Sequence, residues 1–344
     1  MKYQFRYNKY TIYSSIIFVF FILFVSVFVA TRDVSVGIDT QNYLSNFRLI
    51  VDFNYVSELF EPGFQFLTYV ISIFSTSSVF YLYAISVFLS ISFLVCVCLF
   101  YRRYSVEVLI PYHYFIMVCF MMLYSSNFFL TANINGIRQG LSAPLIFIAY
   151  FFVLEKKFLL SAIFSLLAVS FHYSSVLFIF PFVLIFFNVR FVIYFFVISS
   201  SMYFFGVFEF LVQKVSAFTG FPIYEMIKNY SSTGLYEGFN VGFFLYSISP
   251  LVVYCGVRFY NQRLKSSTML EDIFKVYTSL IFPYFVFGFA GYANRYAFTA
   301  WLFMPLFYAF LISILVKKDK VANLLYFGLF FIFSFVFIFK MYNW

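Results

Sequence analysis

Residues 115–154 contain two apolar runs, FIMVCFMMLYSSNFFL (115–130) and LIFIAYFFVL (145–154), separated by a segment that includes NGIRQGLSAP (135–144). A helix that spans a bilayer needs about twenty mostly apolar residues. An arginine at the centre of a bilayer costs roughly 2.5–3.5 kcal/mol on insertion scales. The stretch therefore predicts two membrane helices that meet near Arg138, with the arginine at a membrane edge rather than at mid-depth.

The composition extends this prediction to the whole chain. Of its 344 residues, 64% are hydrophobic and 10% are charged, whereas a soluble domain has about 25% charged residues. The net charge of +9 comes from small basic groups between apolar runs, as the positive-inside rule expects. Composition and charge predict an all-α polytopic integral membrane protein without a nucleic-acid partner.

The hydropathy pattern predicts a single transmembrane domain over residues 1–344, with about 11–12 transmembrane helices, some of them broken or re-entrant. The first apolar run is too long for a signal-peptide core, and we expect it to be an uncleaved span with its N-terminus inside. The run at 63–76 is short enough to be a re-entrant or surface-lying half-helix. The candidate runs are 11–30, 63–76, 79–100, 108–130, 138–154, 158–171, 173–188, 190–210, 241–258, 273–290, 296–316 and 321–339.

Two longer loops, 31–62 and 211–240, fall on the outer side when the basic groups are placed inside. In the first loop, Tyr43, Phe47, Ile50 and Val51 recur at helical spacing, which predicts a short amphipathic helix on the membrane surface. The second loop holds Gly, Pro and Tyr, and we expect it to be an ordered, aromatic-rich loop.

Several polar residues from distant parts of the chain fall on the same predicted outer side, as a site between helices requires. Each also has a structural interpretation, which the sequence leaves open. The aspartate can cap the helix that follows it, the glutamate before Pro62 can begin a helix, the arginines can extend to headgroups, and the histidine can be a hydrogen-bonded packing residue. The residues are Asp39, Glu61, Arg138, Gln139, His172 and Arg295.

The chemistry of this set fits a lipid-linked diphosphate at the outer membrane edge. Arginines bind phosphate through planar, bidentate donors, and a carboxylate or neutral histidine can take a proton from a hydroxyl. The chain has no P-loop and no H-E-x-x-H motif, and its four cysteines all lie in apolar runs. We therefore expect neither a bound metal nor a cofactor.

At these residues the chain resembles the EpsG-like family of polysaccharide polymerases, which includes Wzy-type O-antigen and exopolysaccharide polymerases. The resemblance covers most of residues 30–300, and no single motif is specific alone. It rests on the order of five motifs: G-x-D-x-x-x-Y at Gly37, Asp39 and Tyr43, then FEPGF at 60–64, IRQG at 137–140, FHYSS at 171–175 and NRY at 294–296.

The resemblance implies an enzyme of the bacterial inner membrane that joins repeat units carried on undecaprenyl diphosphate at the periplasmic face. It also implies a helical fold similar to that of the lipid-sugar-dependent membrane glycosyltransferases. The expected partners are the lipid-linked donor and acceptor and the membrane lipids; association with a chain-length regulator is left open.

From the chemistry and the resemblance together, we expect Arg138 and Arg295 to bind the donor diphosphate, and Asp39, or else His172, to activate the acceptor hydroxyl. A further group is expected to bind substrate: Gln139, Tyr43, Asn294, Tyr296, Tyr173 and Glu61. Gly136, Gly140 and Pro144 are expected to break the helix so that the arginine faces inward.

Two other classes of function stay open on sequence alone. A flippase for lipid-linked sugar needs basic residues deep in several helices and a cavity reached from both sides. A membrane acyltransferase needs a histidine in a span and an arginine on the cytoplasmic side. The placement of Arg138 and Arg295 at one outer face favours the polymerase over both.

Overall fold

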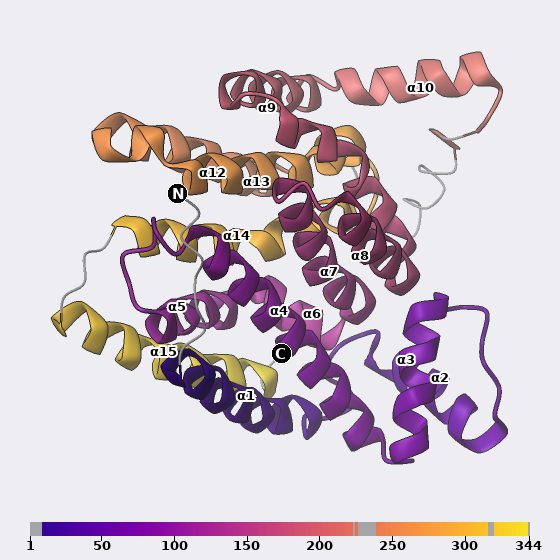
Figure 1. Cartoon of the computed structure of the whole chain (residues 1–344). Coiled ribbons are helices and arrows are strands. Elements are labelled where there is room, and N and C mark those ends of the chain that lie inside the picture. The colour runs from indigo at the N-terminus through magenta and orange to yellow at the C-terminus, as the bar shows by residue number, and fades with distance from the viewer. Residues whose placement is uncertain (1–8, 223, 226–238, 316–319, 343–344) are drawn as a thin grey trace. The chain divides into compact units, whose positions relative to one another are not determined.

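The computed structural model describes residues 9–222, 224–225, 239–315 and 320–342. Throughout these ranges the secondary structure is helical, without strands (Figure 1). Six of the described helices are long and apolar enough to cross a membrane, and the number rises to eight if each of two bent pairs is one span. The prediction of an all-α polytopic membrane protein is thus confirmed.

The number of helices long enough to span is smaller than the predicted 11–12. Some apolar runs form helices that are too short: α3 (Pro62–Phe74) and α8 (Phe158–Phe171). The run at 173–188 forms two 3-10 helices, η1 (Tyr173–Phe178) and η2 (Phe180–Phe186). A hydropathy profile detects the length of an apolar run, but it does not detect a turn inside the run. The count predicted from hydropathy therefore exceeds the number of described helices that are long enough to span.

Two apolar runs bend sharply. Helices α5 (Tyr112–Ser125) and α6 (Asn127–Ile134) meet at 74°, and α9 (Val189–Phe204) and α10 (Val207–Thr219) meet at 78°. Helix α10 extends into the predicted outer loop 211–240. Residues 223 and 226–238 of that loop lie outside the described residues.

The chain divides into two compact units, residues 1–176 with 308–344, and residues 177–307. The first unit contains the helices α1 (Lys9–Ala30), α2 (Thr40–Phe53), α3, α4 (Ser78–Tyr104), α5, α6, α7 (Ile137–Leu154), α8 and α15 (Lys320–Tyr342). Buried polar contacts join its helices: the Ser86 hydroxyl lies 3.1 Å from Ser26 Oγ and 3.0 Å from Asn133 Oδ1. Helix α1 packs against α4 and α15.

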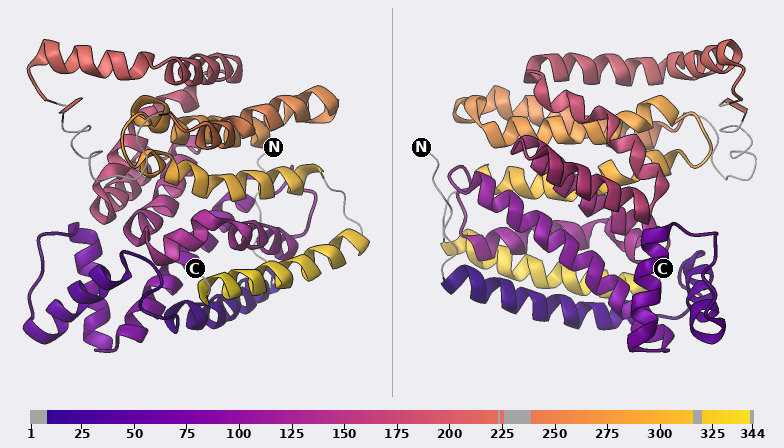
Figure 2. Two further views of the ribbon diagram at one scale, coloured as in Figure 1. Left: turned by 180° about the vertical axis from the view of Figure 1, so that it is seen from behind. Right: turned by 45° about the vertical axis from the view of Figure 1, so that its right-hand side comes forward.

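The predicted amphipathic helix is confirmed as α2, which buries Tyr43, Phe47 and Ile50 on one side and leaves Val51 half-buried; its place on the membrane surface stays a prediction. It lies beside α3 in Figure 1 and in both views of Figure 2. The amides of Asn46 and Gln65 exchange two hydrogen bonds of 3.0 and 3.1 Å between these helices. Because both amides are buried, this reciprocal pair fixes the register of α3 against α2.

The second unit contains η2, α9, α10, α12 (Val241–Tyr260), η3 (Gln262–Ser266), α13 (Thr268–Phe287) and most of α14 (Ala293–Leu315). Ser247 of α12 joins its neighbours, because its carbonyl accepts from the Tyr277 hydroxyl at 2.7 Å and its own hydroxyl accepts from the Trp301 indole at 2.9 Å. All three residues are buried.

Candidate functional site

Three of the predicted site residues meet in the first unit, at the ends of three helices. Glu61 directly precedes α3, Arg138 lies in the first turn of α7, and His172 directly follows α8. We call Glu61, Arg138 and His172 the Glu61 cluster. Its members are separated in sequence by 77 and 111 residues from the glutamate, so tertiary packing alone brings them together.

Glu61 is the centre of the cluster. Its Oε2 accepts a hydrogen bond from Arg138 Nη1 at 2.5 Å, and its Oε1 lies 2.9 Å from His172 Nδ1. The backbone N–H of Tyr173 also donates to Oε1, at 3.3 Å. The glutamate side chain is only 5% exposed, whereas the arginine and histidine side chains are 27% and 21% exposed. The carboxylate is therefore shielded from solvent, whereas the arginine and histidine side chains that contact it are partly accessible.

The charge of Glu61 follows from these contacts. Burial is the largest single influence and opposes ionisation, but the hydrogen bonds from His172 and Arg138 together outweigh it and lower the pKa of Glu61 from 4.5 to about 2. The carboxylate is thus ionised at neutral pH and only accepts hydrogen bonds. Its partner nitrogen Nδ1 must then carry the proton, so a neutral His172 has its lone pair on Nε2.

The local sequence explains why the carboxylate is free to make these contacts. Glu61 has the extended conformation at the N-cap of α3, with Pro62 in the first turn, which confirms the predicted helix start. Its side chain makes no capping hydrogen bond to its own helix. At Gly63, an added Cβ would lie 2.3 Å from Ser170 Oγ and 2.8 Å from the Ser170 carbonyl oxygen. Only glycine allows α3 to approach α8 this closely.

The helix break that orients Arg138 lies before α7 rather than within it. Helix α6 ends at Ile134, and Gly136 occupies the N-cap of α7. The prediction that Gly140 and Pro144 also break the helix is wrong, because both lie inside α7. Gly140 instead lets two helices approach, since a Cβ there would lie 2.7 Å from the Ala132 Cβ.

Aromatic side chains surround the arginine. Its Cζ lies 4.9 Å from the centroid of the Phe60 ring, and the rings of Phe60, Tyr43 and Phe64 contact one another at 5.5–5.8 Å. The Tyr43 hydroxyl donates to the Asn135 carbonyl at 3.0 Å. The guanidinium thus lies over the Phe60 ring, which packs on the rings of Tyr43 and Phe64. Its Nε–H is buried and has no hydrogen-bond partner among the described residues.

Asp39 lies one turn before Tyr43 on α2. It occupies the N-cap position, as predicted, but its side chain makes no capping hydrogen bond. The pKa of Tyr43 is raised, first by burial; Arg138 opposes this increase and Asp39 adds to it. Tyr43 thus interacts electrostatically with both Asp39 and Arg138.

Arg32 is a buried residue that the sequence interpretation did not single out. It is 4% exposed and donates from Nη1 to the Val29 carbonyl at 2.6 Å and from Nη2 to Thr40 Oγ1 at 3.3 Å. Burial lowers its pKa to about 10. An arginine that follows an apolar run is usually a headgroup contact, so the sequence carried no signal that this one is buried.

The remaining predicted residues are less closely grouped. Gln139 is buried in α7, and the Tyr173 side chain is 61% exposed although its backbone contacts Glu61. Asn294, Arg295 and Tyr296 begin α14 in the second unit. Arg295 lies 4.5 Å from the Tyr292 ring centroid, and Tyr296 packs on Phe287 at 5.5 Å. That these residues join Arg138 in one site stays a prediction.

The Glu61 cluster combines two chemical capacities. Arg138 offers a cation with donors beyond the one that Glu61 uses, which suits phosphate oxygens. His172 offers an imidazole whose Nδ1 is held by a carboxylate, the arrangement that orients histidine bases in many enzymes. The glutamate contacts both partners, and its expected contact with substrate stays a prediction.

The family comparison agrees with this architecture. A family model, the EpsG family, matches residues 15–344. No curated protein and no solved structure matches the chain significantly. Because the match extends over nearly the whole sequence, the chain belongs to the EpsG family.

Proposed function

We propose that this protein is a polysaccharide polymerase that joins oligosaccharide repeat units carried on undecaprenyl diphosphate at the periplasmic face of the bacterial inner membrane. In the reaction, a hydroxyl of the lipid-linked acceptor attacks the anomeric carbon of the donor sugar. The bond from that carbon to the diphosphate breaks, the electron pair leaves with the diphosphate, and the hydroxyl proton passes to a base. Membership of the EpsG family supports a role in polysaccharide synthesis.

The observation that carries the proposal is the contact of one buried carboxylate with both an arginine and a histidine. Arg138 uses Nη1 for Glu61, and its buried Nε–H has no hydrogen-bond partner in the described ranges. That buried nitrogen is out of reach of a ligand, but the arginine side chain as a whole is 27% exposed. Diphosphate oxygens can therefore bind its exposed donors, and the guanidinium then stabilises the leaving group.

The same contact favours His172 over Asp39 as the group that takes the proton. The ionised Glu61 accepts from Nδ1–H, and within the described part of the chain the His172 side chain makes no other hydrogen bond. Nε2 is then the available base, and the carboxylate stabilises the imidazolium that forms. Asp39 and Tyr43 remain proposed contacts of the acceptor sugar, with Gln139, Tyr173, Asn294 and Tyr296 as further sugar contacts and Arg295 as a second diphosphate ligand.

The proposal is tested by the surface polymer of a deletion strain complemented with variants. Arg138→Ala and Arg295→Ala should leave protein levels intact and reduce the polymer to single repeat units. Wild-type ladders in both variants would contradict the diphosphate role. The deletion phenotype also separates the other functions: loss of a flippase removes all surface repeat units, whereas loss of an acyltransferase leaves full-length, undecorated polymer.

A further inference from the structure

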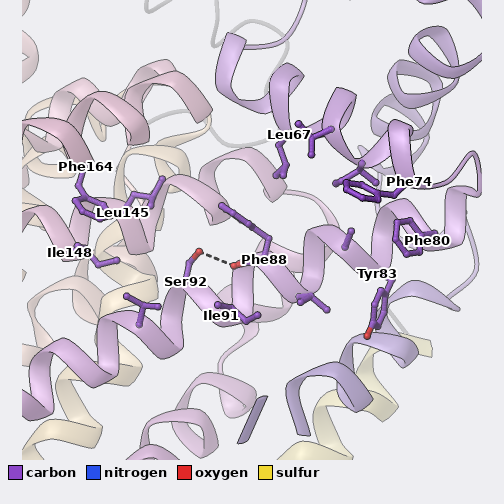
Figure 3. A pocket seen from close by; sticks show the side chains of 15 residues that line it. Leu67, Phe74, Phe80, Tyr83, Phe88, Ile91, Ser92, Leu145, Ile148 and Phe164 are labelled. Carbon is purple, nitrogen blue, oxygen red and sulfur yellow. Dashed lines mark hydrogen bonds between the residues drawn. The ribbon is translucent and has the colours of Figure 1, made fainter. Parts of the chain in front are cut away.

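The first unit contains an apolar groove with a volume of about 470 Å³, lined by residues of α3, α4, α7 and α8. Figure 3 shows it as an elongated space along α4, with Phe74 and Phe80 near one end, and Leu145, Ile148 and Phe164 near the other. Its volume falls in the range of roughly 300–1,000 Å³ typical of ligand pockets.

The chemistry of the lining is almost purely hydrocarbon. Thirteen of its fifteen residues are aliphatic or phenylalanine; the exceptions are Tyr83 and Ser92. The Ser92 hydroxyl donates to the Phe88 carbonyl at 2.8 Å, so the helix itself satisfies it (Figure 3). A groove lined in this way favours the binding of a flexible apolar chain. A sugar or a phosphate would lose its hydrogen bonds to water there without gaining new ones, so its binding is unfavourable.

The groove lies close to every member of the Glu61 cluster. Phe88, near the middle of the groove in Figure 3, stacks on Phe171 at 5.9 Å, and Phe171 directly precedes His172. On α7, Leu145 lies about two turns, or roughly 10 Å, beyond Arg138. On α3, Leu67 lies a similar distance, roughly 9 Å, beyond Glu61.

The same three helices thus supply both the polar cluster and the apolar groove. A ligand that fills both must carry an anionic group at one end and an extended hydrocarbon chain at the other. Ordinary phospholipids share this description, but they do not place a diphosphate directly on the chain. The cluster supplies the cation in Arg138, whose side chain is 27% exposed, and the groove begins about two helical turns from it.

We propose that this groove is the binding site for the prenyl chain of the lipid diphosphate whose phosphates bind Arg138. This inference rests on the proposed function and extends it, because it assigns the part of the site that selects the lipid carrier. The groove begins about two helical turns from the cluster, so it holds isoprene units beyond those nearest the diphosphate, which geranyl diphosphate lacks, and it orients the donor sugar toward His172. Recognition of the chain then contributes to substrate affinity independently of the sugar sequence.

The test compares two probes with the same headgroup, undecaprenyl diphosphate and geranyl diphosphate, on the purified full-length protein in detergent. Val87→Trp fills the groove from α4, and Ala84→Leu fills it less. Leu166→Trp is the matched control, because Leu166 is 70% exposed on α8 and does not line the groove. Retained thermal unfolding transitions establish that each variant is folded.

The wild type should bind the long-chain probe more tightly than the short one. Val87→Trp should lower the affinity for undecaprenyl diphosphate about tenfold, because the larger side chain displaces methylene groups of the ligand from an apolar site. Ala84→Leu should lower this affinity by a smaller factor. Geranyl diphosphate should change by less than about twofold in both variants, and Leu166→Trp should leave both affinities unchanged.

Three results would overturn the assignment of the groove: equal binding of both probes by the wild type, unchanged long-chain affinity in folded Val87→Trp, or displacement of undecaprenyl diphosphate by an equal concentration of phosphatidylglycerol. These results leave the diphosphate role of Arg138 intact. If the wild type binds neither probe, the proposed function itself fails, so the two failures are distinguishable.

Discussion

Replacement of Glu61 by glutamine tests the centre of the proposed site, because it keeps the shape of the side chain and removes its charge. The surroundings lower the pKa of the carboxyl from 4.5 to about 2. This difference corresponds to about 3 kcal/mol of preferential stabilisation of the carboxylate. The group is only 5% exposed, so solvent screening removes little of this energy.

The charge acts on catalysis through His172. When the histidine takes the acceptor proton it becomes an imidazolium, which the carboxylate stabilises and a neutral amide does not. Loss of a charge-assisted hydrogen bond costs the imidazolium roughly 1.5–3 kcal/mol, so the rate of glycosyl transfer falls about ten- to a hundredfold. Glu61→Gln should therefore reduce polymer to one or very few repeat units, and in vitro turnover of a lipid-linked substrate should fall by this factor.

Glu58→Gln is the matched control, since Glu58 lies in the same loop, is exposed and makes none of these contacts. Glu61→Asp keeps the charge on a shorter side chain and should restore part of the activity. Equal impairment of Glu61→Gln and Glu58→Gln would show that the loop, not the cluster, is responsible. Folded Glu61→Gln protein with wild-type turnover would refute the coupling of the carboxylate to the histidine.

Three further predictions follow from the same geometry. Since the pKa of Glu61 is depressed in the folded state, its stabilising contribution is complete above about pH 4.5 and is lost as the pH falls toward about 2; the difference in melting temperature between wild type and Glu61→Gln should be present at pH 7 and disappear near pH 2. Arg138→Lys should fail to support polymer ladders although it keeps the charge, because an ammonium cannot bind Glu61 and a phosphate through one planar fork; full-length ladders would mean that any cation suffices. Gly63→Ala should destabilise the protein by about 1–3 kcal/mol through its clash with the Ser170 backbone, whereas Gly256→Ala, where nothing lies within 4 Å, should not lower the melting temperature.

Much of the local structure is predictable from the sequence. The apolar runs identify the protein as a polytopic membrane protein, because each backbone polar group in a bilayer must be satisfied within a helix. The spacing of Tyr43, Phe47 and Ile50 predicts α2, and Pro62 predicts the start of α3. These features depend on residues close in sequence, so a single segment contains the information.

The bends and the site depend on contacts that no segment contains. The 74° turn at Ser126 lies in a run that hydropathy reads as one span; the Ser126 hydroxyl caps α6 locally, but that cap does not give the angle between the two helices. Glu61, Arg138 and His172 can each be identified as unusual polar residues in an apolar chain, but the sequence does not show that one carboxylate contacts both others. That contact exists because Gly63 lets α3 approach α8 and because the break at Gly136 begins α7 beside them. The sequence by itself thus determined the membrane environment and the candidate residues, and only the tertiary packing of three helix ends decided which of them act together.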